Sequence, residues 1–272
     1  WSAPALASVN WRYLPQSNEF IWFSQKSDWG HLYLHDLATG KLKHQITSGD
    51  WNVTQIGHID PVSRTLWIRG VGREGGDPYF VRYYKVGMDG GDVTLLTPEN
   101  ANHTITPSAD DKYFVDVYST ISTAPVAVLR DGNGKQVSEL ARADLTRLKA
   151  AGWVAPESFT VKARDGKTDL YGQMYKPSNF DASKKYPIVT YIYPGPQVGS
   201  IRTRSFMPAQ GDNQALAELG FIVIAIDGMG TPLRSKAFQD AYYGNMADNT
   251  LPDQVGALKQ LAAKYPWIDA TR

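Results

Sequence analysis

The chain has 272 residues, of which 28 are lysine or arginine and 27 are aspartate or glutamate, so it carries almost no net charge. A near-neutral chain gives no reason to expect nucleic acid or an anionic membrane as the partner, and 42% hydrophobic residues are typical of a globular protein. The absence of cysteine excludes a disulfide framework, a thiolate zinc site and a cysteine nucleophile. No stretch reaches the roughly 18 apolar residues of a membrane span. The opening residues WSAPALAS contain neither Met nor a basic leader, as expected for the interior of a longer polypeptide.

Up to about Ala141 the sequence consists of short alternating segments separated by turns, with almost no helical spacing. The segments fall into groups of four that recur at roughly forty-odd residues, a period typical of β-propeller blades. The predicted strands are Val9–Leu14, Phe20–Ser24, His31–His35 and Leu42–Ile46 in the first group, Val53–Ile59, Thr65–Arg69, Tyr79–Val86 and Val93–Leu96 in the second, and His103–Thr106, Tyr113–Tyr118, Val126–Leu129 and Gln136–Leu140 in the third. We therefore predict about three C-terminal blades of a β-propeller over residues 1–144.

Glycine turns join the last two predicted strands of each group at matching places. They are Ala38-Thr-Gly-Lys41, Asp89-Gly-Gly-Asp92 and Asp131-Gly-Asn-Gly134. Glycine and asparagine tolerate the positive φ of tight hairpins, so the repeat is expected to be structural. Three blades cannot close a ring, since propellers have roughly four to eight, and further blades are expected before Trp1.

The pattern changes after a short helix predicted at Leu145–Gly152. A hairpin follows, with strands predicted at Glu157–Lys162 and Asp169–Tyr175. Two continuous apolar strands of the kind buried in parallel sheets are predicted at Ile188–Tyr193 and Phe221–Ile226, with a short helix between them at Asn213–Leu219. Thr250 and Asp253 form a [ST]-x-x-[DE] signal for the start of a last helix. The order predicts the N-terminal half of an α/β-hydrolase-type sheet over residues 145–272.

Motifs in both halves resemble the prolyl oligopeptidase family of serine peptidases, most closely its dipeptidyl peptidase IV branch. They are Trp29-Gly-His-Leu-Tyr-Leu-His-Asp36, Ile46-Thr-Ser-Gly-Asp-Trp51, Lys184-Lys-Tyr-Pro187, Tyr191-Ile-Tyr-Pro-Gly-Pro196, Phe221-Ile-Val-Ile-Ala-Ile-Asp-Gly228, Asp253-Gln254 and Trp267-Ile-Asp269. Their order along nearly the whole chain carries more weight than any single motif.

The resemblance implies a catalytic role for Tyr193, which matches the family tyrosine whose hydroxyl stabilises the oxyanion of the tetrahedral intermediate. A donor already aimed at that developing charge lowers the barrier, and its loss costs roughly 3–4 kcal/mol. Pro194 and Pro196 are expected to fix backbone angles, and Gly195 to permit a conformation that other residues resist. On spacing alone, the preferred interpretation of Tyr193 is a strand-end aromatic that packs its ring and makes a local hydrogen bond with its hydroxyl.

The nucleophile is absent from the sequence, because no Gly-x-Ser-x-Gly occurs in the 272 residues. In the family this elbow follows the strand after Trp-Ile-Asp, with Asp and His later, so all three catalytic residues are expected beyond Arg272. The sequence also departs from the family pattern at Met229, Ser235 and Thr250, where the family usually carries arginine, glycine and glutamate. With these departures, a divergent or weakened enzyme is an alternative that the sequence leaves open.

Other candidate residues have plainer interpretations. Tyr191 is expected to be a core residue on the same side of the strand as Tyr193. Arg202 and Arg204 either touch a substrate carboxylate or backbone, or lie on the surface. His31 and His35 are four apart on a strand, which disfavours a metal pair. We predict no metal site and no cofactor.

The resemblance implies a serine exopeptidase that releases N-terminal dipeptides, of the Xaa-Pro or Xaa-Ala type, from short peptides through an acyl-enzyme. The 272 residues alone are expected to be inactive. An acylaminoacyl or prolyl endopeptidase relative and a non-catalytic, peptide-binding propeller scaffold are the alternatives. The full-length protein is expected to be a homodimer in the periplasm or secreted, with no membrane span in this chain.

Overall fold

The computed structural model describes residues 11–110, 112–193 and 195–271. The chain divides into two compact units. The first extends to Arg142, without Thr120–Ala124 and with the later stretch Leu233–Ala237, and the second contains the remainder.

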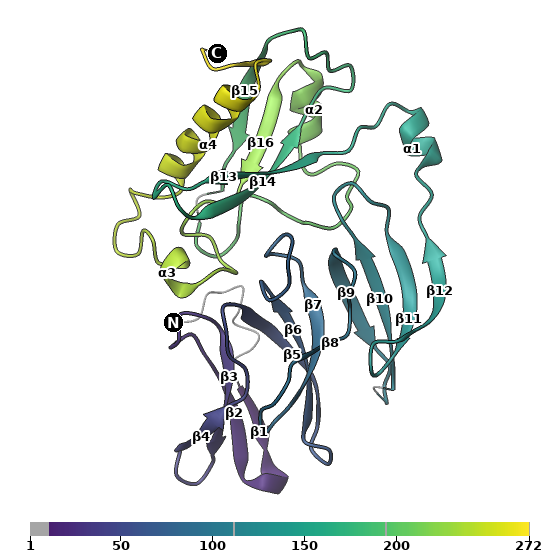
Figure 1. Ribbon diagram of the computed structural model, residues 1–272, viewed down its shortest axis with the longest axis vertical. Coiled ribbons are helices and arrows are strands. Elements are labelled where there is room, and N and C mark those ends of the chain that lie inside the picture. Colours follow the sequence, from purple (N-terminus) through teal and green to yellow (C-terminus); the bar gives the residue numbers. More distant parts are fainter. Residues whose placement is uncertain (1–10, 111, 194, 272) are drawn as a thin grey trace. The chain divides into compact units, whose positions relative to one another are not determined.

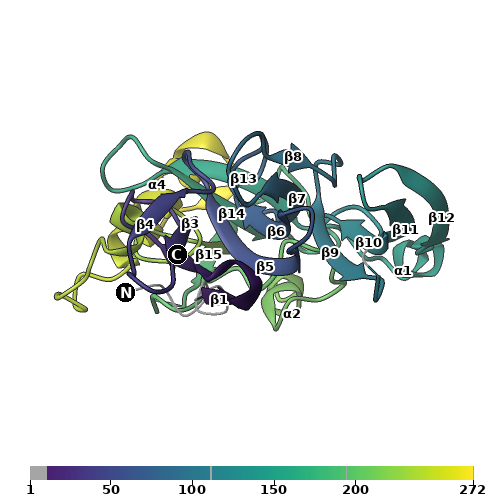
Figure 2. The ribbon, with the colours of Figure 1, turned by 90° about the horizontal axis from the view of Figure 1, so that it is seen from below.

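Three four-stranded antiparallel sheets follow one another in chain order in the first unit (Figures 1 and 2). They are β1 (Trp11–Leu14), β2 (Glu19–Ser24), β3 (His31–Asp36) and β4 (Leu42–Gln45); β5 (Asn52–Asp60), β6 (Thr65–Val71), β7 (Arg82–Gly87) and β8 (Thr94–Leu95); and β9 (Asn102–Pro107), β10 (Tyr113–Ser119), β11 (Val126–Asp131) and β12 (Gln136–Arg142). The predicted blades are confirmed, although Val9, at the start of the first predicted strand, lies outside the described residues.

Side-chain alternation places one face of each sheet against its neighbour. Ile21 on β2 and Leu34 on β3 share a buried core with Leu66 on β6, which joins the first sheet to the second. Tyr83 on β7 and Phe114 on β10 form an edge-to-face pair with ring centroids 5.2 Å apart, which joins the second sheet to the third. The alternation of residues along each strand therefore determines which side chains face these two interfaces.

A threonine and an asparagine recur 50 residues apart and fasten one sheet to the next. Thr47 Oγ1 accepts a hydrogen bond from a backbone N–H of β3 at 3.2 Å, and Thr97 Oγ1 accepts the equivalent bond from β7 at 3.0 Å. Asn52 Oδ1 and Asn102 Oδ1 accept from the N–H of the residue just before β3 and β7, at 2.7 and 2.8 Å. Each pair satisfies backbone donors where a sheet ends and the next begins.

The second unit contains a five-stranded mixed sheet in the order β13-β14-β16-β15-β17. Its elements are α1 (Thr146–Ala150), β13 (Glu157–Lys162), β14 (Asp169–Tyr175), β15 (Tyr186–Tyr191), α2 (Asn213–Glu218), β16 (Ile222–Ile226), α3 (Lys236–Gln239), α4 (Leu251–Lys264) and β17 (Ile268–Asp269), of which α3 is split by the boundary between the units. β16 runs parallel to β15 and antiparallel to β14. The predicted α/β sheet is therefore confirmed, with a short parallel strand, β17, added at its edge.

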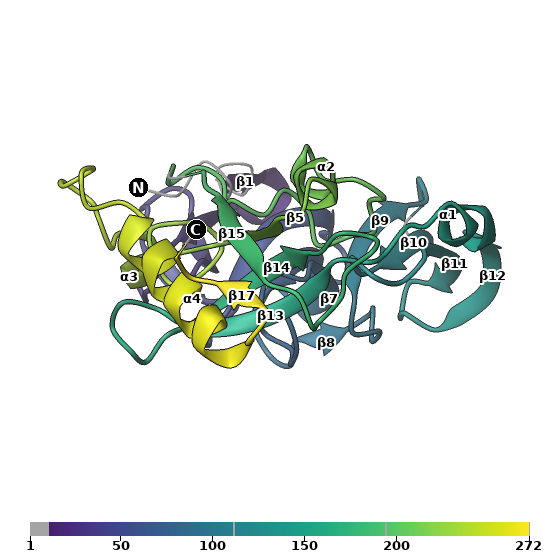
Figure 3. The same cartoon turned by 90° about the horizontal axis from the view of Figure 1, so that it is seen from above.

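Helices cover both faces of this sheet (Figure 3). Ile222 and Ile224 of β16 pack in one core with Leu261 of α4, whereas Val223 packs with Ala217 of α2. Burial on both faces explains why β16 reads as a continuous apolar run rather than an alternating one. Among the described residues, no helix is both long and apolar enough to cross a membrane.

The start of α4 was predicted correctly, but the predicted capping box is wrong. Thr250 occupies the N-cap, yet its side chain makes no capping bond and its buried Oγ1 has no hydrogen-bond partner among the described residues. Asn249 Oδ1 instead accepts from the N–H of Leu251 at 2.9 Å. Asp253 is engaged elsewhere, which the sequence pattern could not reveal.

Candidate active site

Tyr193 lies just beyond the carboxyl end of β15, in the loop that follows it. The strand ends at Tyr191, two residues earlier than predicted. The side chain of Tyr193 is 38% exposed. In open α/β sheets, ligands bind outside the carboxyl ends of the parallel strands, so the position is one where a phenol can reach a substrate.

Two hydrogen bonds hold Tyr193 in place. Its backbone N–H donates to Ser200 Oγ at 3.0 Å. Its hydroxyl oxygen accepts from Gln197 Nε2 at 2.8 Å. Because the amide supplies the hydrogen of that second bond, the phenol proton of Tyr193 is left to donate to another group.

Close packing favours glycine at position 195. A Cβ built on Gly195 would lie 2.6 Å from Tyr193 Cε1 and 2.7 Å from Gln197 Oε1. That it adopts a conformation closed to other residues stays a prediction. Pro194 lies outside the described residues, and the carbonyl of Pro196 accepts from Gln239 Nε2 at 3.1 Å.

The far end of the loop is fixed by Asp227, the residue directly after β16. Asp227 Oδ1 accepts from the N–H of Ile201 at 3.0 Å, and Oδ2 pairs with Arg204 Nη2 at 2.6 Å. A Cβ on Gly199 would lie 2.2 Å from Asp227 Oδ1, so the loop passes directly over the carboxylate. Of the two roles left open for Arg204, the structure supports neither, because this arginine is a buried partner of Asp227.

Asp253 and Gln254 tie the start of α4 to the same edge of the sheet. Fully buried Asp253 accepts from the N–H groups of Arg164 and Met229 at 2.8 and 2.9 Å, and also from the Arg164 guanidinium. Gln254 accepts from Thr190 Oγ1 at 2.9 Å and donates to the carbonyl of Ile226, the last residue of β16, at 3.0 Å. Side chains from the start of α4 therefore hold the carboxyl ends of β15 and β16, the edge that carries Tyr193.

The three departures from the family pattern have different surroundings. Met229 packs against the apolar core under α4, and its N–H is held by Asp253. Ser235 lies in the stretch that groups with the first unit. Thr250 leaves a buried hydroxyl without a partner among the described residues, which costs about 1–3 kcal/mol in general.

Histidines and carboxylates of the first unit are engaged in structural bonds. His31 contacts Thr47 Oγ1 at 3.0 Å and the carbonyl of Gly49 at 2.8 Å, and burial is the largest cause that lowers its pKa. Glu99, His103 and Asp116 lie close enough to hold a metal ion. However, the guanidinium of Arg130 donates to Asp116 at 2.9 Å and to Glu99 at 2.6 Å, so a cation already neutralises this cluster.

Sequence reasoning did not identify Gln197, Ser200 or Asp227 as parts of the site. Asp227 carried a usable signal, because an acidic residue directly after a buried parallel strand lies at the ligand-binding edge. Gln197 and Ser200 carried none, since both are polar residues in a loop. Tyr191, expected in the core, is instead half-buried and lines a pocket.

Propeller blades followed by a mixed α/β sheet with helices on both faces define a propeller-bearing α/β hydrolase. Two family models match the chain: the dipeptidyl peptidase IV N-terminal region over residues 3–125 and the prolyl oligopeptidase family over residues 209–272. The chain belongs to the dipeptidyl peptidase IV group of the prolyl oligopeptidase family, whose members are serine peptidases.

Individual relatives agree with this assignment. Human dipeptidyl peptidase 8 is 31% identical over 241 residues, which cover 84% of this chain and 26% of the human protein. A crystal structure of a Bacteroides ovatus protein described as a dipeptidyl aminopeptidase IV matches with a TM-score of 0.79 at 27% identity, over 96% of this chain and 39% of that one. Dipeptidyl peptidase 4 of Porphyromonas gingivalis, at 23% identity, shares the fold with a TM-score of 0.79, over 98% of this chain and 37% of that one. The chain thus spans about a quarter of the length of the human relative.

Proposed function

We propose that the chain is part of a serine exopeptidase that releases N-terminal dipeptides, of the Xaa-Pro or Xaa-Ala type, from short peptides. In this proposal Tyr193 donates a hydrogen bond to the oxyanion of the tetrahedral intermediate. The observation that carries it is the bond from Gln197 to the phenol oxygen, which leaves the proton of an exposed hydroxyl available at the carboxyl edge of the sheet.

The chemistry requires a donor that is already in place when charge develops. A serine attacks the peptide carbonyl, the carbonyl oxygen becomes negative, and the phenol stabilises it before the acyl-enzyme forms. The loop suits this task because Ser200, Gln197 and Gly195 fix the backbone and the ring of Tyr193. No Gly-x-Ser-x-Gly occurs in the 272 residues, so the proposal assigns the nucleophile to another part of the full-length polypeptide.

The relatives support the substrate class, since human dipeptidyl peptidase 8 is named for dipeptide release. We extend the proposal to short peptides as substrates, a homodimeric full-length protein, and a periplasmic or secreted location. These three parts are independent of the role of Tyr193.

Replacement of Tyr193 by phenylalanine in the full-length protein tests the proposal. We expect Tyr193→Phe to lower kcat for a dipeptidyl chromogenic substrate by about two orders of magnitude, because one oxyanion donor is lost. The urea midpoint of unfolding is expected to stay close to wild type, since the ring and its packing are kept. Tyr243→Phe, which removes the hydroxyl of a highly exposed tyrosine in the same unit, is the matched control. Equal kcat values for wild type and Tyr193→Phe would remove Tyr193 from the mechanism.

A further inference from the structure

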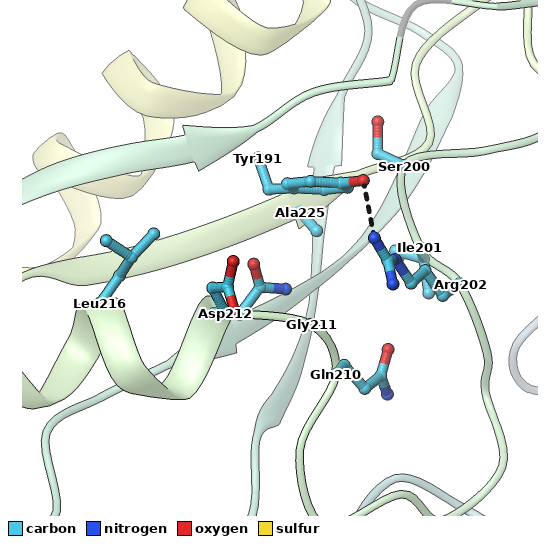
Figure 4. Close-up of a pocket in the computed structure, with 10 residues that line it drawn as sticks. Tyr191, Ser200, Ile201, Arg202, Gln210, Gly211, Asp212, Leu216 and Ala225 are labelled. Carbon is cyan, nitrogen blue, oxygen red and sulfur yellow. Dashed lines mark hydrogen bonds between the residues drawn. The ribbon is translucent and has the colours of Figure 1, made fainter.

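A pocket of about 130 Å³ lies between α2 and the carboxyl ends of β15 and β16, entirely within the second unit (Figure 4). Its polar lining consists of Tyr191, Ser200, Arg202, Gln210, Asp212 and Asn213. A cavity of about 10–15 Å³ already holds one water molecule, so this pocket has room for several. That volume fits a small group such as a carboxylate with its attached carbon and substituent.

Arg202 supplies the positive charge of this pocket. Its Nη2 lies 3.5 Å from the hydroxyl oxygen of Tyr191, a long contact, and its guanidinium carbon lies 5.8 Å from the centre of the same ring. Among the described residues no carboxylate lies within ion-pair distance of Arg202, in contrast to Arg204, which is paired with Asp227. The planar guanidinium therefore keeps donors for a ligand that can accept two parallel hydrogen bonds, as a carboxylate does.

The backbone beside Arg202 leaves room for the guanidinium. Gly211 has a φ of +59°, and a Cβ there would lie 3.6 Å from the Arg202 guanidinium carbon. Buried Gln210 is drawn below Arg202 in Figure 4 and is held by a bond from its Nε2 to the carbonyl of Thr203 at 3.2 Å. Part of the lining beside Arg202 is thus fixed in place.

Asp212 limits the charge of the ligand. It is an exposed residue of the same lining, and its charge is among the causes that raise the pKa of Arg202, after the hydrogen bond and charge of Tyr191. With one guanidinium and one carboxylate, the empty pocket is neutral overall. A dianion such as phosphate would meet Asp212, whereas a single carboxylate can bind Arg202 without a second charge to accommodate.

Ser200 connects the pocket to the proposed oxyanion donor. Its Oγ accepts the N–H of Tyr193, and the same residue lines the pocket. A peptide whose scissile carbonyl lies at Tyr193 has only one main-chain carboxylate, at its C-terminus. In an enzyme that releases N-terminal dipeptides, that carboxylate belongs to the leaving part of the substrate.

We propose that Arg202 and Tyr191 form a subsite that binds the C-terminal carboxylate of short peptide substrates. The inference rests on the proposed peptidase function for the identity of the ligand. The subsite favours tripeptides and similarly short peptides, because their carboxylate lies within one or two residues of the cut.

The test measures equilibrium binding to the full-length protein, so it does not depend on turnover. The probes are the tripeptide Ala-Pro-Ala with its second peptide bond reduced to CH2–NH, as the free acid and as the C-terminal amide. Calorimetry gives the ratio of their Kd values for wild type, Arg202→Gln and Arg147→Gln. Arg147 is an exposed arginine of α1 outside the pocket lining, and its replacement removes the same charge.

We expect wild type and Arg147→Gln to bind the acid about tenfold more tightly than the amide, the effect of one charge-assisted contact. In Arg202→Gln the two Kd values should become equal through weaker binding of the acid. A wild-type ratio near one, or a preference for the acid that survives Arg202→Gln, would overturn the subsite. Binding that depends on Arg202 in a full-length protein without peptidase activity would uphold the subsite and remove the proposed function. Cleavage of unmodified Ala-Pro-Ala and of its C-terminal amide at equal rates, unaffected by Arg202→Gln, would do the reverse.

Discussion

At the scale of single residues, the candidate site depends on how a side chain from its own loop directs the phenol of Tyr193. Gln197 folds back over Gly195 and donates to the Tyr193 oxygen at 2.8 Å. A hydrogen bond into the phenol oxygen stabilises the negative charge that builds there when the phenol donates its own proton. Gln197 is thus a positioning residue that acts through Tyr193 and need not touch the substrate.

Removal of the Gln197 amide should weaken catalysis only while Tyr193 has its hydroxyl. In the full-length protein we expect Gln197→Met to lower kcat about five- to tenfold, which corresponds to one hydrogen bond of about 1 kcal/mol. KM should change little, because the amide does not bind substrate in this scheme. In the Tyr193→Phe background, the same Gln197→Met change should have no further effect on kcat, as a double-mutant cycle would show. Additive losses in the cycle would mean that Gln197 acts independently of Tyr193.

At the scale of elements, a buried carboxylate fastens the first two sheets of the propeller unit together. Glu19 on β2 is only 2% exposed and accepts from Arg64 Nη1 at 2.9 Å and from Lys43 Nζ. Arg64 lies in the turn between β5 and β6 and also pairs with Asp89 at 2.7 Å. Burial raises the pKa of Glu19, but the hydrogen bonds from Arg64 and Lys43 outweigh it and lower the pKa from 4.5 to about 2.

This pKa shift gives the propeller unit an acid-sensitive contribution to stability. A carboxyl whose pKa is lowered on folding stabilises the folded state above its unfolded pKa of 4.5, and the contribution is lost as pH falls toward about 2. At about 1.4 kcal/mol per pKa unit, and with a discount for partly exposed partners, we expect Glu19→Gln to cost roughly 2–3 kcal/mol at pH 7. The difference from wild type should narrow at pH 3, measured by urea unfolding followed by tryptophan fluorescence.

Glu139→Gln is the matched control for that measurement. Glu139 pairs with Arg142 at 2.7 Å on β12, but both side chains are exposed. Exposed pairs contribute about 0–1 kcal/mol, so this variant should differ little from wild type at either pH. Equal losses for the two variants, or a constant effect of Glu19→Gln from pH 7 to pH 3, would contradict the role of Glu19.

Elements were readable from the sequence where one local pattern decides them. The hairpin glycines Gly40 and Gly134 have φ of +68° and +85°, as the turn signals predicted. Features that depend on contacts distant in the sequence were not readable. Asp253 fitted the local pattern of a capping box. Its carboxylate oxygens instead accept from the N–H groups of Met229 and Arg164, which no pattern near Asp253 in the sequence predicts.

Contacts distant in the sequence also decide the different roles of the two arginines after the Tyr193 loop. Arg202 and Arg204 are indistinguishable by composition and spacing. Arg204 forms an ion pair with Asp227, which lies 23 residues later. The two side chains meet because β16 ends beside the loop. Arg202 lines a pocket because α2 and β15 meet there. The sequence could therefore name Tyr193 by resemblance, whereas the supporting contacts and the pocket needed the structure.

At the scale of the whole molecule, the 272 residues contain a proposed oxyanion donor but no Gly-x-Ser-x-Gly elbow for a nucleophile. A donor stabilises an intermediate only after a nucleophile has attacked, so its presence alone does not accelerate peptide hydrolysis. We expect the purified chain to hydrolyse a dipeptidyl chromogenic substrate no faster than buffer. The full-length polypeptide is expected to turn the substrate over under the same conditions.

This last prediction requires a folded sample, because an unfolded chain would be inactive for a trivial reason. The eight tryptophans provide a near-UV circular dichroism signal that reports fixed tertiary packing. Several lie in packed surroundings, such as Trp51 beside His31 and Trp267 beside Phe180, with ring centroids 5.5 and 5.0 Å apart. A folded chain that releases dipeptides faster than buffer, and loses that activity on Tyr193→Phe, would show that a nucleophile lies within these residues after all. The proposal that another part of the full-length polypeptide supplies the nucleophile would then be wrong, even with Tyr193 still in the mechanism.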